Sequence, residues 1–291
     1  MTDSQQAYDN IFELKNRGVG RIMSNDKLRV AVTGVLGKMG QEAVRAILRD
    51  EGLELVGGVD IRGQGTDLGL LTGSSALGKK VTADLAKLLE ESGAQVMVDF
   101  TNPQAVRKNI YTALEKKVHA VVGTTGLTEE DLSAIDKLAQ EQKVGVFVAP
   151  NFALGAVLMM KFAREAARYF PHVEIIEMHH DQKMDAPSGT ALRTAELILQ
   201  SRGELVQGSP HEFEKIGGVR GGEYHGIRLH SVRLPGLVAH QEVIFGGLGQ
   251  TLTIRHDSIN RESFMPGLIL AIHKVIHLKG VVVGLEHLLE V

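Results

Sequence analysis

Short apolar runs alternate with stretches of helical hydrophobic spacing from residue 28 to about residue 149. The apolar runs predict strands covered on both faces, and the helical spacing predicts amphipathic helices. Thr128 followed by Asp131 predicts a capping box at the start of one helix. Alternation of this kind predicts βαβ units and a parallel sheet. The predicted strands are 28–33, 53–60, 96–100, 120–123 and 144–149, and the predicted helices are 38–50, 84–91, 103–117 and 128–142.

The pattern changes after Asn151. A long predicted helix over 155–169 leads to a strand over 173–180 and to a second helix that starts at Gly189. Residues 227–256 then show successive strands separated by glycines, with no helix between them, which predicts antiparallel or mixed pairing. A last helix is expected over 261–278, where it could cover either part of the chain.

Length and composition limit the possible classes of protein. With 291 residues the chain is long enough for about two domains. Its net charge of −3 argues against a dedicated nucleic-acid binder or a polybasic membrane protein. The absence of cysteine excludes disulfides, thiolate metal sites and a cysteine nucleophile. No apolar run approaches the ~20 residues that span a bilayer, and no secretory signal is visible, so we expect a cytoplasmic protein.

Residues 1–24 show little hydrophobic periodicity and are expected to be an N-terminal extension. A second methionine, Met23, stands just before the first predicted strand. The extension is therefore interpreted as a disordered leader or as the product of an upstream start codon, with a functional arm as the alternative.

Three glycines, Gly34, Gly37 and Gly40, occupy the turn between the first predicted strand and helix. Glycines let backbone N–H groups approach a pyrophosphate, and the helix start adds a partial positive charge. Leu36 stands where the usual second glycine of a dinucleotide fingerprint would be, so a purely structural turn is the alternative. Asp60 ends the second strand 20 residues after Gly40, where a carboxylate can bind the ribose hydroxyls of NAD. We therefore expect a Rossmann-type, doubly wound α/β domain that binds a dinucleotide.

Two further loops follow predicted strands, at the sheet edge where open α/β sheets bind ligands. They are Gly123-Thr124-Thr125-Gly126 and Ala149-Pro150-Asn151-Phe152. Both are expected to contact the cofactor, although ordinary turn chemistry would also select these residue types.

The segment 174–191 carries the strongest chemical signal. A predicted strand delivers His179 and His180, Lys183 follows in a loop, and Ser188-Gly189-Thr190 starts a helix that can bind an anion. A metal site is the first alternative, but adjacent strand residues point to opposite faces and could not easily share one ion. A polar strand end with satisfied histidines is the second. On strand parity Glu177 shares a face with His179, and we hypothesise that it orients this histidine.

At this segment the chain resembles the dihydrodipicolinate reductase family, also called 4-hydroxy-tetrahydrodipicolinate reductase. The family signature Glu-[Ile/Val]-x-Glu-x-His-x-x-x-Lys-x-Asp-x-Pro-Ser-Gly-Thr-Ala is met at every position from Glu174 to Ala191. The resemblance covers essentially everything after Met23. Its other matching motifs are the turn 34–40, Asp99-Phe100-Thr101, Gly123–Gly126, Asn151-Phe152, Arg233, His240, Phe245 and Arg261–Phe264.

The resemblance implies a reduction of a cyclic dicarboxylate with NADH or NADPH, in the diaminopimelate route to lysine. It implies that His179 is the catalytic acid/base and Lys183 the proton donor, with no metal. Asp60 favours NADH, while Lys38 and Arg62 are compatible with NADPH. The substrate carboxylates would be bound by His180, Ser188, Gly189 and Thr190. The cofactor would be bound by Gly34, Val35, Leu36, Gly37, Lys38, Met39, Asp60, Gly123, Thr124, Thr125, Ala149, Pro150, Asn151 and Phe152.

The resemblance also implies a domain division and an assembly. Residues 25–150 would form the dinucleotide-binding domain, joined by the C-terminal segment 263–291, and 151–262 would form an α+β domain on a mixed sheet. This second domain would bind substrate and assemble a homotetramer, with neither nucleic acid nor membrane as partner. The alternatives are another two-domain dehydrogenase, acting on an amino-acid semialdehyde or imine, and a nicotinamide-binding sensor without activity.

Overall fold

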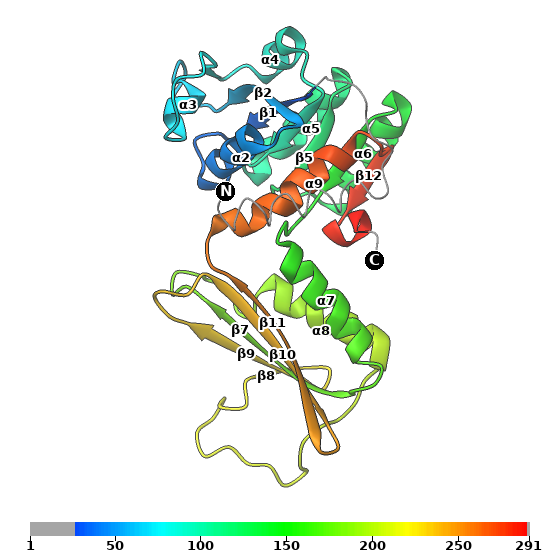
Figure 1. Cartoon of the computed structure of the whole chain (residues 1–291). Helices are drawn as coiled ribbons and strands as arrows, with labels where there is room; N and C mark the ends of the chain where they lie inside the picture. The colour runs from blue at the N-terminus through cyan, green and yellow to red at the C-terminus, as the bar shows by residue number, and fades with distance from the viewer. Residues whose placement is uncertain (1–26, 290–291) are drawn as a thin grey trace. The chain divides into compact units, whose positions relative to one another are not determined.

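The computed structural model describes residues 27–289, which divide into two compact units (Figure 1). The first unit contains the described residues up to Val148 together with Leu268–Val282, and the second contains Ala149–Gly267 together with the described residues from Val283 onward. This division differs from the predicted domains in that 149–150, 263–267 and 283–289 group with the second unit. The predicted extension, 1–24, lies outside the described residues.

The first unit contains a seven-stranded sheet in the order β12-β6-β5-β4-β1-β2-β3. All pairings among its first six strands are parallel, as the strand–helix alternation predicts. The strand order reverses between β1 and β4, and such a reversal is the position at which open α/β sheets bind ligands. The strands are β1 (Leu28–Thr33), β2 (Leu53–Val59), β3 (Val81–Thr82), β4 (Val96–Asp99), β5 (His119–Val122), β6 (Gly145–Val148) and β12 (Gly280–Val283).

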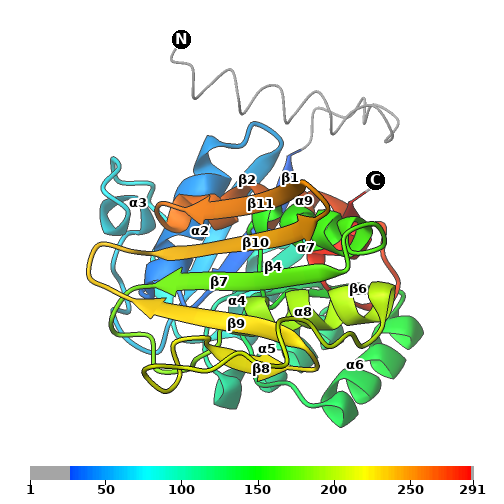
Figure 2. The same cartoon turned by 90° about the horizontal axis from the view of Figure 1, so that it is seen from below.

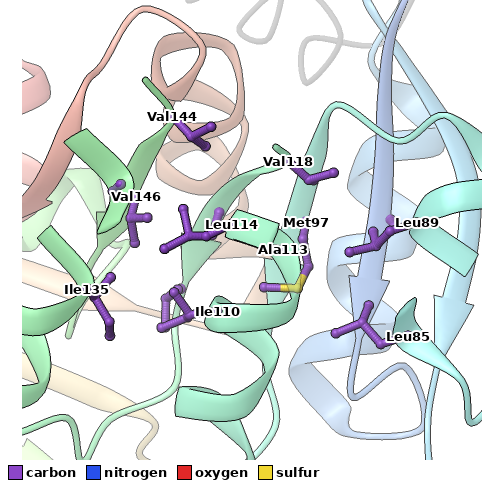
Figure 3. Close-up of a cluster of buried hydrophobic side chains, with 14 of the residues drawn as sticks. Leu85, Leu89, Met97, Ile110, Ala113, Leu114, Val118, Ile135, Val144 and Val146 are labelled. Atoms are coloured by element: carbon purple, nitrogen blue, oxygen red, sulfur yellow. The ribbon is translucent and has the colours of Figure 1, made fainter. Parts of the chain in front are cut away.

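Helices bury both faces of this sheet. Alternating strand residues such as Ala31 and Met97 join one hydrophobic cluster with α4, α5 and α6 (Figure 3), whereas Val30 and Val32 point to the opposite face and are equally buried. The predicted capping box is confirmed, because Thr128 and the Asp131 side chain cap each other's backbone N–H groups. The helices are α2 (Lys38–Arg49), α3 (Leu68–Leu71), α4 (Leu85–Ser92), α5 (Pro103–Glu115) and α6 (Glu129–Gln142).

The second unit contains a five-stranded mixed sheet in the order β11-β10-β7-β9-β8, seen face-on in Figure 2. Its central strand pairs antiparallel with β10 and parallel with β9. The register places Gln241 of β10 between Glu177 of β7 and His256 of β11, so these polar residues form one row across three strands. The strands are β7 (His172–His179), β8 (Gly222–Tyr224), β9 (Ile227–Arg233), β10 (Ala239–Gly247) and β11 (Gln250–Ser258).

Two helices, α7 (Leu154–Ala166) and α8 (Gly189–Arg202), lie together on one face of the mixed sheet (Figures 1 and 2). The other described helical segments are α9 (Met265–Val275) and the short 3-10 helices η1 (Arg261–Phe264) and η2 (Leu285–Leu288). The helix expected over 261–278 is therefore a 3-10 turn followed by α9, and α9 starts in the second unit and continues in the first.

Candidate active site

His179 stands at the end of β7, on the face that α7 and α8 cover. Its Nδ1 lies 2.5 Å from Oε2 of Glu177, two residues earlier on the same face of the strand. An ionised carboxylate can only accept, so this contact places a proton on Nδ1 and leaves Nε2 for another partner. The predicted orientation of His179 by Glu177 is therefore present in the geometry.

Glu177 is a fully buried carboxylate with a complete set of donors. Arg233 of β9 reaches both of its oxygens, at 2.9 Å and 2.7 Å, and the backbone N–H of Ser188 donates to Oε1 at 3.2 Å. Burial alone raises the pKa of Glu177, but hydrogen bonds from His179 and Arg233 outweigh burial and lower this pKa from 4.5 to about 2. The residue is therefore an anion at neutral pH and holds His179 in place.

Arg233 connects this anion to the following loop. Its guanidinium also donates to the backbone carbonyl of Asp185 at 2.7 Å, and Arg233 pairs with His179 in the parallel register of β7 and β9. A planar guanidinium that binds a carboxylate in a bidentate manner fixes direction as well as distance. The loop that carries Lys183 is thus tied to the strand that carries His179.

The start of α8 provides open backbone donors. Ser188 is the N-cap, and its Oγ accepts from the N–H of Ala191 at 3.2 Å. Within the described residues, the N–H groups of Gly189 and Thr190 have no hydrogen-bond partner. A Cβ at Gly189 would meet nothing within 4 Å, so space for a ligand lies beside these donors. Free N–H groups at a helix start form a carboxylate site.

Lys183 and His180 stand in the loop between β7 and α8. The Lys183 ammonium binds Oδ1 and Oδ2 of Asp185 at 2.7 Å and 2.9 Å, and the hydrogen bond from Lys183 is the main cause that lowers the pKa of Asp185. His180 follows β7 and is exposed. The structure therefore pairs the expected proton donor with an acid that sequence reasoning did not include in the site.

A cavity of about 210 Å³ in the second unit joins several of these groups. His179, Ser188 and Thr190 line it, as the sequence analysis expects for substrate residues, whereas Lys183, His180 and Gly189 do not. Gln241 and His256 also line it, and sequence reasoning missed both as site residues. His256 lies so close to α7 that a Cβ on Gly155 would fall 2.4 Å from its ring, and burial lowers the pKa of this imidazole.

The glycine turn of the first unit has the close approaches that a dinucleotide loop needs. Gly34 has φ of +77°, and a Cβ on Gly40 would lie 2.1 Å from the Gly34 carbonyl oxygen. The helix after the turn has no side-chain cap, and in the described part of the chain the N–H groups of Lys38 and Met39 have no hydrogen-bond partner. These residues fit the pyrophosphate of a dinucleotide, because the helix start offers donors and the glycines remove the side chains.

Asp60 directly follows β2, and its carboxylate contacts the same turn. Its Oδ2 accepts from the N–H of Leu36 at 3.1 Å, and its Oδ1 accepts from the N–H of Arg62 at 3.1 Å. The Arg62 side chain is largely exposed, with Nε 3.8 Å from Oδ1. The structure thus brings the glycine turn, Asp60 and Arg62 together at the carboxyl ends of β1 and β2.

Asp99 fixes the loop after β5. This buried carboxylate accepts from Thr124 Oγ1 at 2.6 Å and from Thr33 Oγ1 at 2.8 Å, so it joins the ends of β1, β4 and β5. A Cβ on Gly123 would lie 2.2 Å from the Phe100 ring, so a larger residue here would force this ring to move. The Thr124 side chain points toward Asp99 and the Gly123 N–H donates to the Asp99 carbonyl at 2.9 Å, which leaves the rest of the Gly123–Thr125 backbone and the exposed Thr125 side chain available to a cofactor.

The remaining predicted cofactor loop, Ala149–Phe152, belongs to the second unit. Ala149 and Phe152 are buried, and the Asn151 side chain accepts from the N–H of Ala153, the N-cap residue of α7, at 2.8 Å. Pro150 and Asn151 line the same cavity as His179. The structure therefore groups part of this loop with the candidate substrate residues.

Residues 27–289 contain no helix that is both long and apolar enough to cross a membrane. They also contain no cluster of three or more histidine and acidic residues placed to hold a metal ion.

A glycine turn on a doubly wound sheet, with the acid/base candidates carried on a separate mixed sheet, is the organisation of two-domain nicotinamide-dependent oxidoreductases. Comparison with known protein families gives the same class of protein. The model of the dihydrodipicolinate reductase N-terminus matches 28–152, and that of the C-terminus matches 155–289. The chain belongs to the dihydrodipicolinate reductase family.

Individual relatives cover nearly the whole chain. The 4-hydroxy-tetrahydrodipicolinate reductase of Desulfitobacterium hafniense is 59% identical over 91% of this chain and 99% of its own length. That of Geobacillus kaustophilus is 53% identical over 90% of this chain and 99% of its own length. A dipicolinate-bound dihydrodipicolinate reductase from Paenisporosarcina sp. TG-14 is 49% identical, with a TM-score of 0.83, and covers 91% of this chain and 100% of its own. A Mycobacterium smegmatis amine dehydrogenase, at 17% identity and a TM-score of 0.63 over 88% of this chain and 95% of its own, shares the fold alone.

Proposed function

We propose that this chain reduces 4-hydroxy-tetrahydrodipicolinate to tetrahydrodipicolinate with NADH or NADPH, in the diaminopimelate pathway of lysine biosynthesis. The observation that carries the proposal is the segment Glu174–Ala191, which meets the family signature and holds a buried Glu177–His179 pair beside the start of α8. The conversion adds one hydride and one proton to the ring and releases water. Bound NAD(P)H supplies the hydride.

His179 is proposed as the acid/base. Because Glu177 holds Nδ1, only Nε2 is available to exchange a proton with the substrate. The bidentate contact from Arg233 keeps Glu177 ionised and fixed in direction, so the ring does not have to reorient during turnover. Glu177 and Arg233 act through His179 and are proposed as positioning residues.

Lys183 is proposed as the proton donor. A carbon that has gained electron density after hydride addition needs a proton, and a positioned ammonium can provide it. Asp185 holds the ammonium in the structure, so Lys183 has to leave or share this partner when an anionic substrate arrives. Both residues lie on the loop that Arg233 ties to β9, which limits this exchange to a short side-chain movement.

The substrate carboxylates are proposed to bind at the start of α8. Ser188 is occupied as the cap, whereas the N–H groups of Gly189 and Thr190 are free to donate within the described residues, and His180 is proposed as a third donor. The dipicolinate bound to the Paenisporosarcina relative is itself a dicarboxylate, which supports this ligand class. The formal net charge of the chain is −3, so overall charge does not attract an anionic substrate. Backbone N–H groups at the helix start suit this role because they bind a carboxylate locally.

The cofactor is proposed to bind along the carboxyl ends of β1, β2 and β5. The uncapped start of α2 suits the pyrophosphate, and Asp60 suits the ribose hydroxyls. The full proposed set is Gly34–Met39, Asp60, Gly123–Thr125 and Ala149–Phe152.

We further propose a cytoplasmic homotetramer with no nucleic-acid or membrane partner, as the family resemblance implies. The second unit supports the assembly, because the sheet face opposite α7 and α8 carries the apolar side chains of Ile176, Met178 and Ile244, each only half-buried. Light scattering on the purified chain tests this proposal: a mass of about four chains is expected, and a monomer would contradict it.

The activity is tested by a coupled assay. An aldolase-type synthase forms the substrate from pyruvate and aspartate semialdehyde, and the fall in NAD(P)H absorbance is followed after this protein is added. Enzyme-dependent oxidation is expected only when both synthase substrates are present, and omission of either is the control. Absence of oxidation with both NADH and NADPH would overturn the proposed function.

A further inference from the structure

Gln241 places a primary amide on the floor of the cavity that holds His179. It is the third residue of β10 with only 4% of its surface exposed, and it lines the cavity together with Ser188 and Thr190. The sheet register puts Glu177 on one side of it and His256 on the other. An amide in this position must satisfy its polar atoms within the fold or with a ligand.

The hydrogen bonds of α8 determine which way this amide points. Thr194 donates its single hydroxyl hydrogen to the backbone carbonyl of Thr190 at 2.7 Å. The Thr194 oxygen can then only accept, so the atom of Gln241 that lies 2.7 Å from it must be Nε2. The orientation of the amide follows from this chain of donors, and Oε1 is the atom left to face elsewhere.

Oε1 of Gln241 is buried and has no hydrogen-bond partner among the described residues. The neighbouring Glu177 cannot help, because its carboxylate is an acceptor that is already bound by His179, Arg233 and Ser188. A buried acceptor without a donor is unfavourable, and the imbalance is removed when a ligand brings an N–H or O–H group. A ligand in this cavity is therefore expected to place a hydrogen-bond donor next to Oε1 of Gln241.

We propose that Oε1 of Gln241 accepts a hydrogen bond from the 4-hydroxyl group of the substrate. This inference rests on the proposed function. At neutral pH both carboxyl groups of 4-hydroxy-tetrahydrodipicolinate are ionised and the imine nitrogen carries no hydrogen, so the hydroxyl is the donor that the ligand offers. Gln241 thus distinguishes the hydroxylated substrate from dicarboxylates of similar shape that lack this group.

The test compares two ligands on one variant. Gln241→Met keeps the length of the side chain and removes the acceptor, so kcat/KM for the substrate is expected to fall about 10- to 100-fold. Dipicolinate has no hydroxyl and no N–H group, so its inhibition constant is expected to change less than about 2-fold. Gln250→Met, at the exposed start of β11, is the matched control and should alter neither value.

Equal losses for substrate and dipicolinate, or no loss for either, would overturn the role of Gln241. If Gln241→Met no longer binds dipicolinate in a calorimetric titration, the same two measurements are made on Gln241→Asn. This variant keeps the amide but moves its carbonyl oxygen away from the substrate, so a larger loss in kcat/KM for the substrate than in dipicolinate binding is again expected. Failure of the proposed function is a separate result, since the unmodified chain would then neither turn over the substrate nor bind dipicolinate.

Discussion

The nucleotide loops of the first unit and the histidine cavity of the second are built from different parts of the chain. In the first unit the available groups are backbone N–H groups at the start of α2, and the buried side chain of Asp99 holds the neighbouring strand ends from below. In the second unit the groups that can exchange protons are side chains, held by Glu177 and Arg233.

This difference predicts how each region responds to substitution. A backbone site depends on the conformation of the turn and on the absence of side chains, so it is damaged by adding atoms. A side-chain site depends on functional groups, so it is damaged by removing them. A substitution in one region should therefore change cofactor binding or substrate turnover, but not both to the same extent.

Lys183→Ala should lower kcat about 1000-fold, because it removes the proposed proton donor while the turn that binds cofactor is untouched. The dissociation constant for NADH, measured by fluorescence titration, should change less than about 2-fold. Lys215→Ala, an exposed lysine of the same unit, is the control. A parallel collapse of NADH binding would mean that Lys183 binds the cofactor or supports the fold.

Gly40→Ala should weaken NADH binding about 100-fold, because the turn has to shift from the position that suits a pyrophosphate. The added Cβ would lie 2.1 Å from a backbone oxygen and 2.9 Å from the Cα of Val35. Gly217→Ala has no atom within 4 Å of the new Cβ and serves as the matched control. Unchanged NADH affinity in Gly40→Ala would show that this turn does not hold the cofactor.

Asp60→Ala should weaken NADH about 10-fold and NADPH less, because it removes a ribose partner without adding a contact to the phosphate. The loss of the hydrogen bonds from the N–H groups of Leu36 and Arg62 is common to both cofactors and cancels in the ratio. Binding of the two cofactors is measured side by side. Equal losses would contradict the assignment of Asp60 to the ribose.

Acid should destabilise the second unit through Glu177. The folded-state pKa of this carboxyl is about 2, against an ordinary 4.5. A depressed carboxyl pKa stabilises the fold above the ordinary value, and this contribution is lost as pH falls from about 4.5 toward 2. Over this window the Tm of the unmodified chain should fall by at least about 2 °C more than that of Glu177→Gln. Parallel Tm curves would show that the ionisation of Glu177 does not contribute to the loss of stability in acid.

The same contrast explains what could be read from the sequence. The glycine turn, its helix and the segment 174–191 are local, so spacing alone placed their residues on the correct elements. Arg233 is 56 positions from Glu177, and Gln241 is 47 from Thr194, so only the pairing of β9 and β10 with β7 brings them into the site. The two-residue strand β3 and the four-residue helix α3 are too short to produce a periodic signal.

The measurement that tests the central claim most directly is isotope transfer. The coupled reaction is run with NADH that carries deuterium at both C4 positions of the nicotinamide, and the tetrahydrodipicolinate formed is analysed by mass spectrometry. The account predicts one carbon-bound deuterium in each product molecule, formed in step with NADH consumption. Product without deuterium, or NADH consumption that does not depend on this protein, would contradict it.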